Sequence, residues 1–175
     1  MITHLIILIE DKNLQKTLLE RFLFWYSSNM EKKYSIKNLT ELQTWAEKFI
    51  SELHPKENAQ VITLSGDLGA GKTALVKACA KVLGLNEEIT SPTFVIQKEY
   101  ELERQVYKKM IHIDAYRLES AGELEHLGWN DIISAPENII FLEWPEMVEG
   151  INLAGVKKIH LSINDNENRT LILED

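Results

Sequence analysis

The sequence has few cysteines and arginines and no long hydrophobic run. Cys79 is its one cysteine, so the chain cannot form an internal disulfide, and we expect a reducing, cytoplasmic setting. Only four arginines occur and the formal net charge is −8, which argues against autonomous nucleic-acid binding, because such binding depends on neutralising phosphates. The apolar run at residues 5–9 is too short to span a membrane, and we expect no membrane association.

Residues 1–29 differ from residues 30–175. After the apolar run, hydrophobic residues recur at helical spacing: Leu14, Leu18, Phe22 and Trp25. Two interpretations of this extension stay open. Residues 1–29 precede the functional start of the protein, or they add a strand and a helix packed on the domain. Residues 30–175 are long enough, and the chain is apolar enough at 45%, for one domain with a sizeable core.

The most informative motif occupies residues 66–73 and matches the phosphate-binding pattern G-x-x-x-x-G-K-[ST]; we call these residues the P-loop. It reads Gly66-Asp67-Leu68-Gly69-Ala70-Gly71-Lys72-Thr73. A predicted strand at 61–64 precedes it and a predicted helix at 74–83 follows, with Gly84 as the helix stop. The glycines let backbone amides approach a triphosphate at the positive end of the helix. We expect Lys72 to reach the β- and γ-phosphates of ATP and Thr73 to bind Mg²⁺.

Two further apolar runs end in a carboxylate. Residues 110–113 lead into Asp114, and residues 139–142 lead into Glu143. A strand that ends beside a P-loop would place such an acid near Mg²⁺, where it can hold the ion or orient the attacking water. His112 shares the strand face of Asp114 and is more typical of a packed histidine than of a metal ligand. In the loop after the P-loop helix, Thr93 offers a hydroxyl where phosphate-sensing loops usually lie.

The remaining pattern alternates helices and strands. A helix is predicted over 38–53, capped by Asn38 with Glu41 three residues later, and its expected buried face is Leu39, Leu42, Ala46, Phe49, Ile50 and Leu53. Strands are predicted at 94–100, 109–113, 139–142, 158–163 and 170–173, with a helical segment at 121–127. This order predicts an α/β, P-loop NTPase-like layered fold with a mostly parallel central sheet flanked by helices.

Taken together, the motifs resemble the TsaE (YjeE) family, the ATPases of bacterial tRNA threonylcarbamoyladenosine synthesis. The resemblance covers about residues 34–173 and rests on five segments in the family's order. They are the P-loop, Ser91-Pro92-Thr93-Phe94, the run from His112 to Leu118, Glu123-Leu124 with Leu127-Gly128, and Glu143-Trp144-Pro145-Glu146. Ala115 departs from the leucine common in relatives.

The resemblance implies a small cytoplasmic ATPase that works with the TsaB–TsaD pair, where TsaD transfers the threonylcarbamoyl group to adenosine in ANN-decoding tRNAs. ATP binding and hydrolysis would reset that complex, and the protein would contact tRNA only indirectly, through the complex. By similarity, Thr73 and Glu143 would ligate Mg²⁺, and Asp114 would position the metal or the water. Thr93 would belong to a switch-like loop. Trp144 would lie near the nucleotide, and Arg169 would contact ATP.

Other nucleotide-binding classes fit less well. A GTPase is disfavoured because the guanine-reading N-K-x-D motif is missing. A small-molecule kinase would need an arginine-rich lid, for which the chain has too few arginines. A scaffold that binds nucleotide without hydrolysing it stays open as an alternative. We expect slow hydrolysis by the chain alone and stimulation by TsaB–TsaD.

Overall fold

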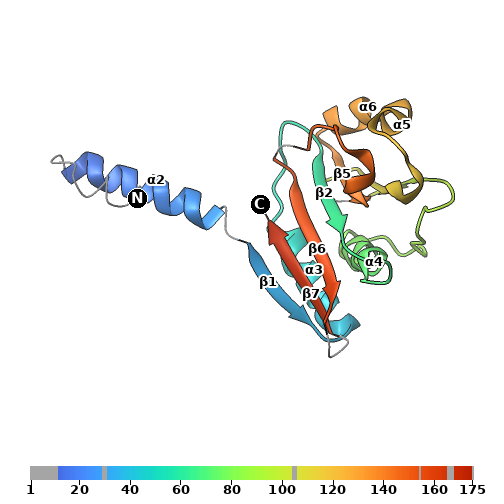
Figure 1. Ribbon diagram of the computed structural model, residues 1–175, viewed down its shortest axis with the longest axis horizontal. Helices are drawn as coiled ribbons and strands as arrows, with labels where there is room; N and C mark the ends of the chain where they lie inside the picture. The colour runs from blue at the N-terminus through green and yellow to red at the C-terminus, as the bar shows by residue number, and fades with distance from the viewer. Residues whose placement is uncertain (1–11, 29–30, 104–105, 154, 165–167, 175) are drawn as a thin grey trace.

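The computed structural model describes residues 12–28, 31–103, 106–153, 155–164 and 168–174. Helices and strands are interspersed along them (Figure 1). The helices, with two 3₁₀ turns labelled η, are α2 (Lys12–Ser28), α3 (Leu39–Ser51), α4 (Lys72–Val82), η1 (Ala115–Arg117), α5 (Ala121–His126), α6 (Trp129–Ser134) and η2 (Pro145–Val148). The strands are β1 (Lys32–Ile36), β2 (Gln60–Ser65), β3 (Gln97–Glu101), β4 (Lys109–Asp114), β5 (Asn138–Glu143), β6 (Lys157–Ile163) and β7 (Arg169–Glu174).

The described strands form one seven-stranded sheet in the order β1-β7-β6-β2-β5-β4-β3. β2 pairs in parallel with β5 and β6, and β4 pairs in parallel with β5. β7 is antiparallel to both of its neighbours and β3 is antiparallel to β4, so β1, β6, β2, β5 and β4 point the same way. The carboxyl ends of β2, β5 and β4 therefore meet at one edge, beside the start of α4. The predicted α/β fold with a mostly parallel sheet is confirmed.

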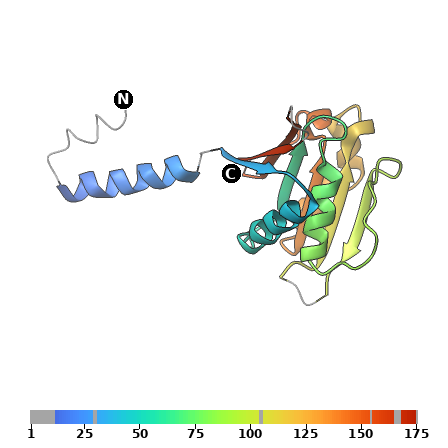
Figure 2. The same ribbon diagram turned by 90° about the horizontal axis from the view of Figure 1, so that it is seen from below.

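The sheet lies between two hydrophobic layers. Successive side chains of a strand point to opposite faces, and the two clusters follow this alternation. On one face, Ile62, Leu64 and Phe141 pack in the cluster that includes the buried apolar residues of α3 and α4. On the other, Ile140 and Leu142 pack in the cluster that includes residues of α5, α6 and η2. Figure 2 shows α3 and α4 side by side on the first face.

The N-cap predicted for helix α3 is confirmed, but the predicted buried face of this helix is wrong at one residue. The side chain of Asn38 accepts a hydrogen bond from the backbone amide of Glu41 at 2.9 Å. Leu39, predicted to be buried, is 75% exposed. It is the first helical residue, and it lines a cavity beside the P-loop instead of entering the core.

Two strands differ more substantially from the predictions. The strand predicted from residue 94 begins only at Gln97, because the amides of Val95 and Ile96 both donate to the carbonyl of Pro92 and turn the chain. Strand β1 was not predicted. It is a lysine-containing edge strand with one buried residue, so its sequence carries little alternation of apolar and polar side chains.

The N-terminal extension contains the helix that its apolar spacing predicted, α2. In Figures 1 and 2 this helix lies apart from the sheet and the helices that cover it. The apolar run at residues 5–9, predicted as a possible extra strand, lies outside the described residues. No helix within the described ranges has the length and apolar character needed to cross a membrane.

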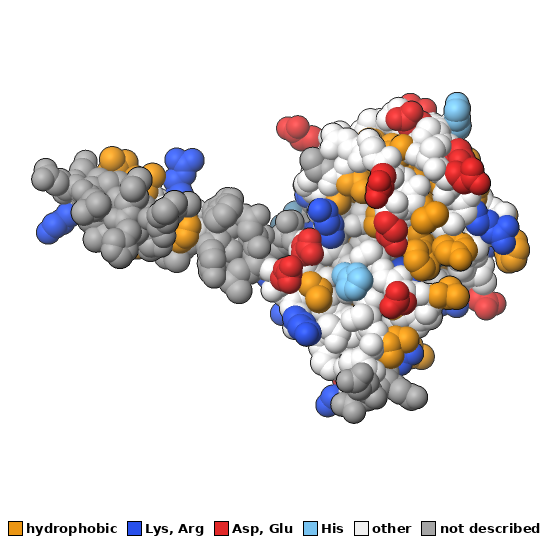
Figure 3. Space-filling model, in the orientation of Figure 1, with side chains coloured by type: hydrophobic (Ala, Val, Ile, Leu, Met, Phe, Trp, Pro, Cys, Tyr) orange, Lys and Arg blue, Asp and Glu red, His pale blue; other side chains and the backbone are white. Residues whose placement is uncertain are grey.

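The surface reflects the acidic composition. On the face seen in Figure 3, acidic side chains are spread over the domain, and hydrophobic side chains form small groups between them. This is the face on which β1, β7 and β6 carry no helix in Figure 1.

Candidate functional site

The P-loop connects the carboxyl end of β2 to the start of α4. Gly66 has a φ of +124°, and a Cβ there would lie 1.9 Å from the carbonyl oxygen of Leu161, so only glycine fits. Gly71, at φ +108°, is the N-cap of α4, and no side chain caps that helix. The first backbone amides of α4 therefore need another partner, and an anion is the partner that a helix start favours.

Lys72 is folded back onto the loop. Its Nζ donates to the carbonyl oxygens of Gly66 at 2.6 Å and Asp67 at 3.0 Å, and it lies 3.6 Å from the ring centroid of Trp144. Burial lowers the pKa of Lys72 below its usual value, and nearby carboxylates, Glu143 foremost, partly oppose that shift. The ammonium is thus held next to the P-loop by weak acceptors that phosphate oxygens can replace.

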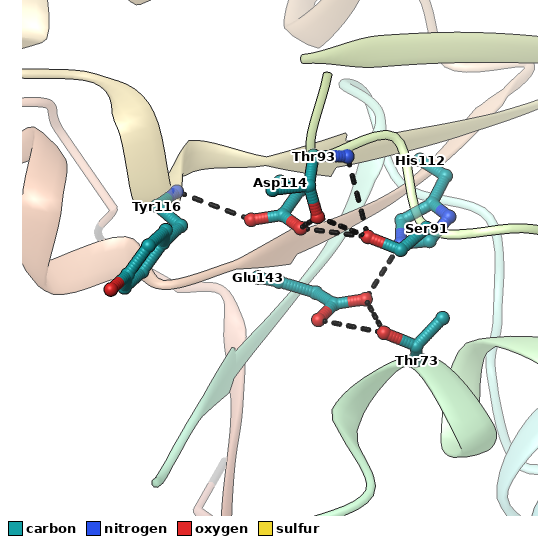
Figure 4. A network of polar contacts seen from close by, with 7 residues as sticks. All are labelled: Thr73, Ser91, Thr93, His112, Asp114, Tyr116 and Glu143. Atoms are coloured by element: carbon teal, nitrogen blue, oxygen red, sulfur yellow. Dashed lines mark hydrogen bonds and ion pairs between the residues drawn. The ribbon is translucent and has the colours of Figure 1, made fainter. Parts of the chain in front are cut away.

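Thr73 and Glu143 meet directly at the start of α4. The Thr73 hydroxyl contacts Glu143 Oε1 at 2.9 Å and Oε2 at 3.2 Å. Glu143 ends β5 and is only 2% exposed. Two residues that the sequence predicted as Mg²⁺ ligands, 70 positions apart, therefore lie side by side (Figure 4).

Asp114, at the end of β4, holds the loop that carries Thr93. Its Oδ2 accepts hydrogen bonds from the hydroxyls of Ser91, at 2.8 Å, and Thr93. Its Oδ1 accepts a hydrogen bond from the amide of Tyr116 at 3.2 Å. Asp114 and Glu143 are register partners on adjacent strands, but Asp114 contacts the loop whereas Glu143 contacts α4. Sequence reasoning did not identify Ser91 as a partner of this carboxylate.

His112 completes the network from the same strand face as Asp114. It is fully buried, and its Nε2 lies 2.8 Å from Glu143 Oε1. The sequence favoured a packed histidine over a metal ligand, and the contact with Glu143 was missed. The usable signal was the two-residue spacing from Asp114, which puts both side chains on the face that meets α4.

Two cavities flank the P-loop and share Gly69, Gly71 and Ala74. The first, which we call the P-loop cavity, has a volume of about 420 Å³ and is lined by Leu68, Gly69, Gly71, Lys72, Thr73, Ala74, Ser91, Thr93, Asp114, Tyr116, Glu143 and Trp144. The second, the apolar cavity, has a volume of about 310 Å³ and is lined by Ile36, Lys37, Asn38, Leu39, Leu42, Gly69, Ala70, Gly71, Ala74, Leu161, Arg169 and Leu171.

The predicted site residues divide between these cavities. Lys72, Thr73, Thr93, Asp114 and Glu143 all line the P-loop cavity, together with Trp144, whose ring lies 5.0 Å from that of Tyr116. Arg169 lines only the apolar cavity, at the first residue of β7. The structure thus brings together every predicted metal and catalytic residue, and it sets Arg169 on the other side of the P-loop.

The donor set at Thr73 and Glu143 suits Mg²⁺. A hydroxyl and a carboxylate are hard oxygen donors, which this ion prefers. Among the described residues no group of three or more His, Cys, Asp and Glu side chains could hold a metal by itself. Mg²⁺ typically takes one or two protein ligands and completes its shell with phosphate oxygens and water. The chain therefore fits Mg²⁺ bound together with a phosphate ligand.

Comparison with known families gives one match that spans most of the chain. A family model described as "Threonylcarbamoyl adenosine biosynthesis protein TsaE" matches residues 36–171. The match includes the P-loop and every residue that lines either cavity.

Curated relatives and a solved structure agree. The chain is 30% identical over 141 residues to the tRNA threonylcarbamoyladenosine biosynthesis protein TsaE of Rickettsia typhi, covering 78% of this chain and 90% of that protein. It is 39% identical over 89 residues to the TsaE of Bacillus subtilis, covering 51% and 52%. The crystal structure of Bacillus subtilis YdiB superposes with a TM-score of 0.67 at 26% identity, covering 83% of this chain and 85% of that one.

Proposed function

The chain belongs to the TsaE family, and from this we propose that it is a Mg²⁺-dependent ATPase that serves tRNA threonylcarbamoyladenosine biosynthesis. The observation that carries the proposal is the contact between Thr73 and Glu143 at the uncapped start of α4. A hydroxyl, a buried carboxylate and a run of backbone amides converge there, which is what a magnesium-bound triphosphate requires.

The P-loop cavity would hold the phosphates. The amides at the start of α4 would bind phosphate oxygens, and Lys72 would exchange its two backbone carbonyl partners for the β- and γ-phosphates. Thr73 and Glu143 would hold Mg²⁺, which neutralises charge on the phosphates when bound. Asp114 and Thr93 are placed on the same cavity wall and would position the attacking water.

The apolar cavity would hold the adenine base. It adjoins the P-loop through Gly69, Gly71 and Ala74, so a nucleotide can extend from one cavity to the other. Leu39, exposed in the structure, would be covered by the base, and burying its apolar surface favours binding. Arg169 at the rim would contact the nucleotide, as the resemblance to the family implied.

Hydrolysis would be slow without a partner. No arginine is among the described residues that line the P-loop cavity, so Lys72 and Mg²⁺ would have to stabilise the transition-state charge alone. An additional cation or an ordered closure would come from the TsaB–TsaD complex, through which the protein would also meet tRNA.

The test is ATP turnover by the purified chain, measured with and without purified TsaB–TsaD. We expect slow Mg²⁺-dependent turnover alone and a clear acceleration with the partners. Equal rates would refute partner stimulation. No Mg²⁺-dependent turnover in either condition would refute the ATPase proposal itself. It would favour the scaffold alternative if the chain still bound ATP and still formed a complex with TsaB–TsaD.

A further inference from the structure

His112 is a buried polar residue that the proposed hydrolysis does not use directly. It lies on β4, with no exposed surface, and its Nε2 is 2.8 Å from Glu143 Oε1 (Figure 4). Its other ring nitrogen, Nδ1, is buried and has no hydrogen-bond partner among the described residues. Within the part of the chain that the structure describes, the ring's one polar contact is therefore with Glu143, the residue that also contacts Thr73.

The unpaired Nδ1 indicates which nitrogen carries the proton. An ionised Glu143 can only accept hydrogen bonds, so the 2.8 Å contact needs a proton on Nε2. A proton on Nδ1 would be a buried donor without an acceptor among the described residues, and orphaned buried N–H groups are rarer in proteins than unpaired acceptors. The geometry thus favours the Nε2–H tautomer, with His112 donating to Glu143.

We propose that His112 is a positioning residue that holds the Glu143 carboxylate in the orientation required to bind Mg²⁺. The inference rests on the proposed function, because it concerns how the Glu143 carboxylate is oriented to bind Mg²⁺. Thr73 and His112 approach Glu143 from different elements, α4 and β4. When the Thr73 oxygen turns to the cation, the bond from β4 still fixes the carboxylate. Hydrogen-bond partners of metal-binding residues commonly set metal affinity in this way.

Strand register explains why His112 can do this. His112 is the register partner of Phe141, and Glu143 lies two residues further along β5 on the same sheet face. Such a diagonal pair is within reach of long side chains. The backbone ladder of β4 and β5 therefore determines the His112–Glu143 distance, and no loop has to be ordered to make the contact.

The test compares two variants by Mg²⁺-dependent binding of a non-hydrolysable ATP analogue. His112→Leu removes the donor, and His112→Gln keeps an amide donor near the position of Nε2. We expect His112→Leu to raise the Mg²⁺ concentration for half-maximal binding about tenfold or more. His112→Gln should stay within about threefold of the parent protein. Binding of the analogue in EDTA should change in neither variant, because the phosphate amides and the apolar cavity are intact.

Coupling to Glu143 separates positioning from packing. In a Glu143→Ala background, adding His112→Leu should leave the Mg²⁺ requirement unchanged, because residues that act through one another are not additive. An unchanged Mg²⁺ requirement in His112→Leu alone would overturn the inference, as would equal loss in the folded Leu and Gln variants. If the parent chain itself bound the analogue without any Mg²⁺ dependence, the proposed function would fail first.

A measurement on the unmodified protein keeps the proposal testable should His112→Leu not fold. Nitrogen-15 NMR of the imidazoles reports which ring nitrogen is protonated. We expect the His112 proton on Nε2 in the nucleotide-free chain, and a proton on Nδ1 alone would contradict the proposal.

Discussion

The two cavities beside the P-loop differ in the side chains that line them. The P-loop cavity is lined by charged and hydroxyl side chains that already bond to one another, such as Thr73 to Glu143 and Thr93 to Asp114. The apolar cavity is lined mainly by aliphatic side chains, with Leu39 exposed. The first cavity would set which chemistry occurs, and the second would add affinity without acting on the phosphates. Changes in the two should therefore have separable effects.

The largest effect should come from Lys72→Met. It removes the lysine that lines the P-loop cavity, and we expect ATP affinity to fall at least about 100-fold. The melting temperature without nucleotide should stay the same or rise, because burial lowers the pKa of Lys72 and the charged form is therefore a cost to the fold. ATP titration measures the affinity, and thermal melting measures the stability. An unfolded Lys72→Met variant would contradict the claim that Lys72 serves nucleotide binding and not the fold.

Glu143→Gln should have the next largest effect. The amide keeps the shape of the side chain but removes the negative charge offered to Mg²⁺, so turnover should fall about 100-fold. Nucleotide binding in EDTA should be unchanged, because no metal is then involved. Turnover assays in Mg²⁺ with binding assays in EDTA give the comparison. Loss of metal-free binding would mean that Glu143 serves the fold rather than the metal.

Leu39→Ala should act on the apolar cavity alone. We expect ATP and ADP affinities to fall about three- to tenfold, since part of a leucine side chain would no longer be covered by the base. Inorganic tripolyphosphate, which can fill only the P-loop cavity, is the matched probe. Its affinity should not change in Leu39→Ala but should collapse in Lys72→Met. Equal weakening of both ligands in Leu39→Ala would contradict the assignment of the base.

The smallest effect concerns pH. Since burial lowers the pKa of Lys72, the ammonium loses its proton below the usual lysine range, and ATP affinity should decline as pH rises through that value. Between the lowered and the ordinary pKa the unfolded state binds more protons, so this residue makes stability rise with pH over the same window. ATP titrations and thermal melts from pH 7 to about 10 should show affinity falling while the contribution of Lys72 to stability rises. In Lys72→Met both of these pH-dependent contributions should be lost.

The contrast between the cavities also explains what the sequence could predict. The charged residues of the P-loop cavity were predicted because they lie in one continuous motif or directly after apolar strands, as Asp114 and Glu143 do. The apolar cavity was not, because its walls come from residues 36–42 and 161–171 and only the strand order β1-β7-β6-β2 brings them together. Leu39 was assigned to the core since periodicity alone does not distinguish a core face from a cavity wall.

Contacts between predicted residues were harder to foresee than the residues themselves. The bond from His112 to Glu143 depends on the register of β4 against β5, which no local pattern encodes. The turn at Pro92 moved the start of β3, because two amides bond to one carbonyl there. The first feature follows from strand pairing between distant segments, and the second from a local turn.

The most direct test of the account is a crystal structure of the chain with Mn²⁺ and a non-hydrolysable ATP analogue, with the metal located by its anomalous signal. We predict the triphosphate on the amides at the start of α4, and the metal beside Thr73 and Glu143. A metal or triphosphate bound away from these two residues would contradict the account.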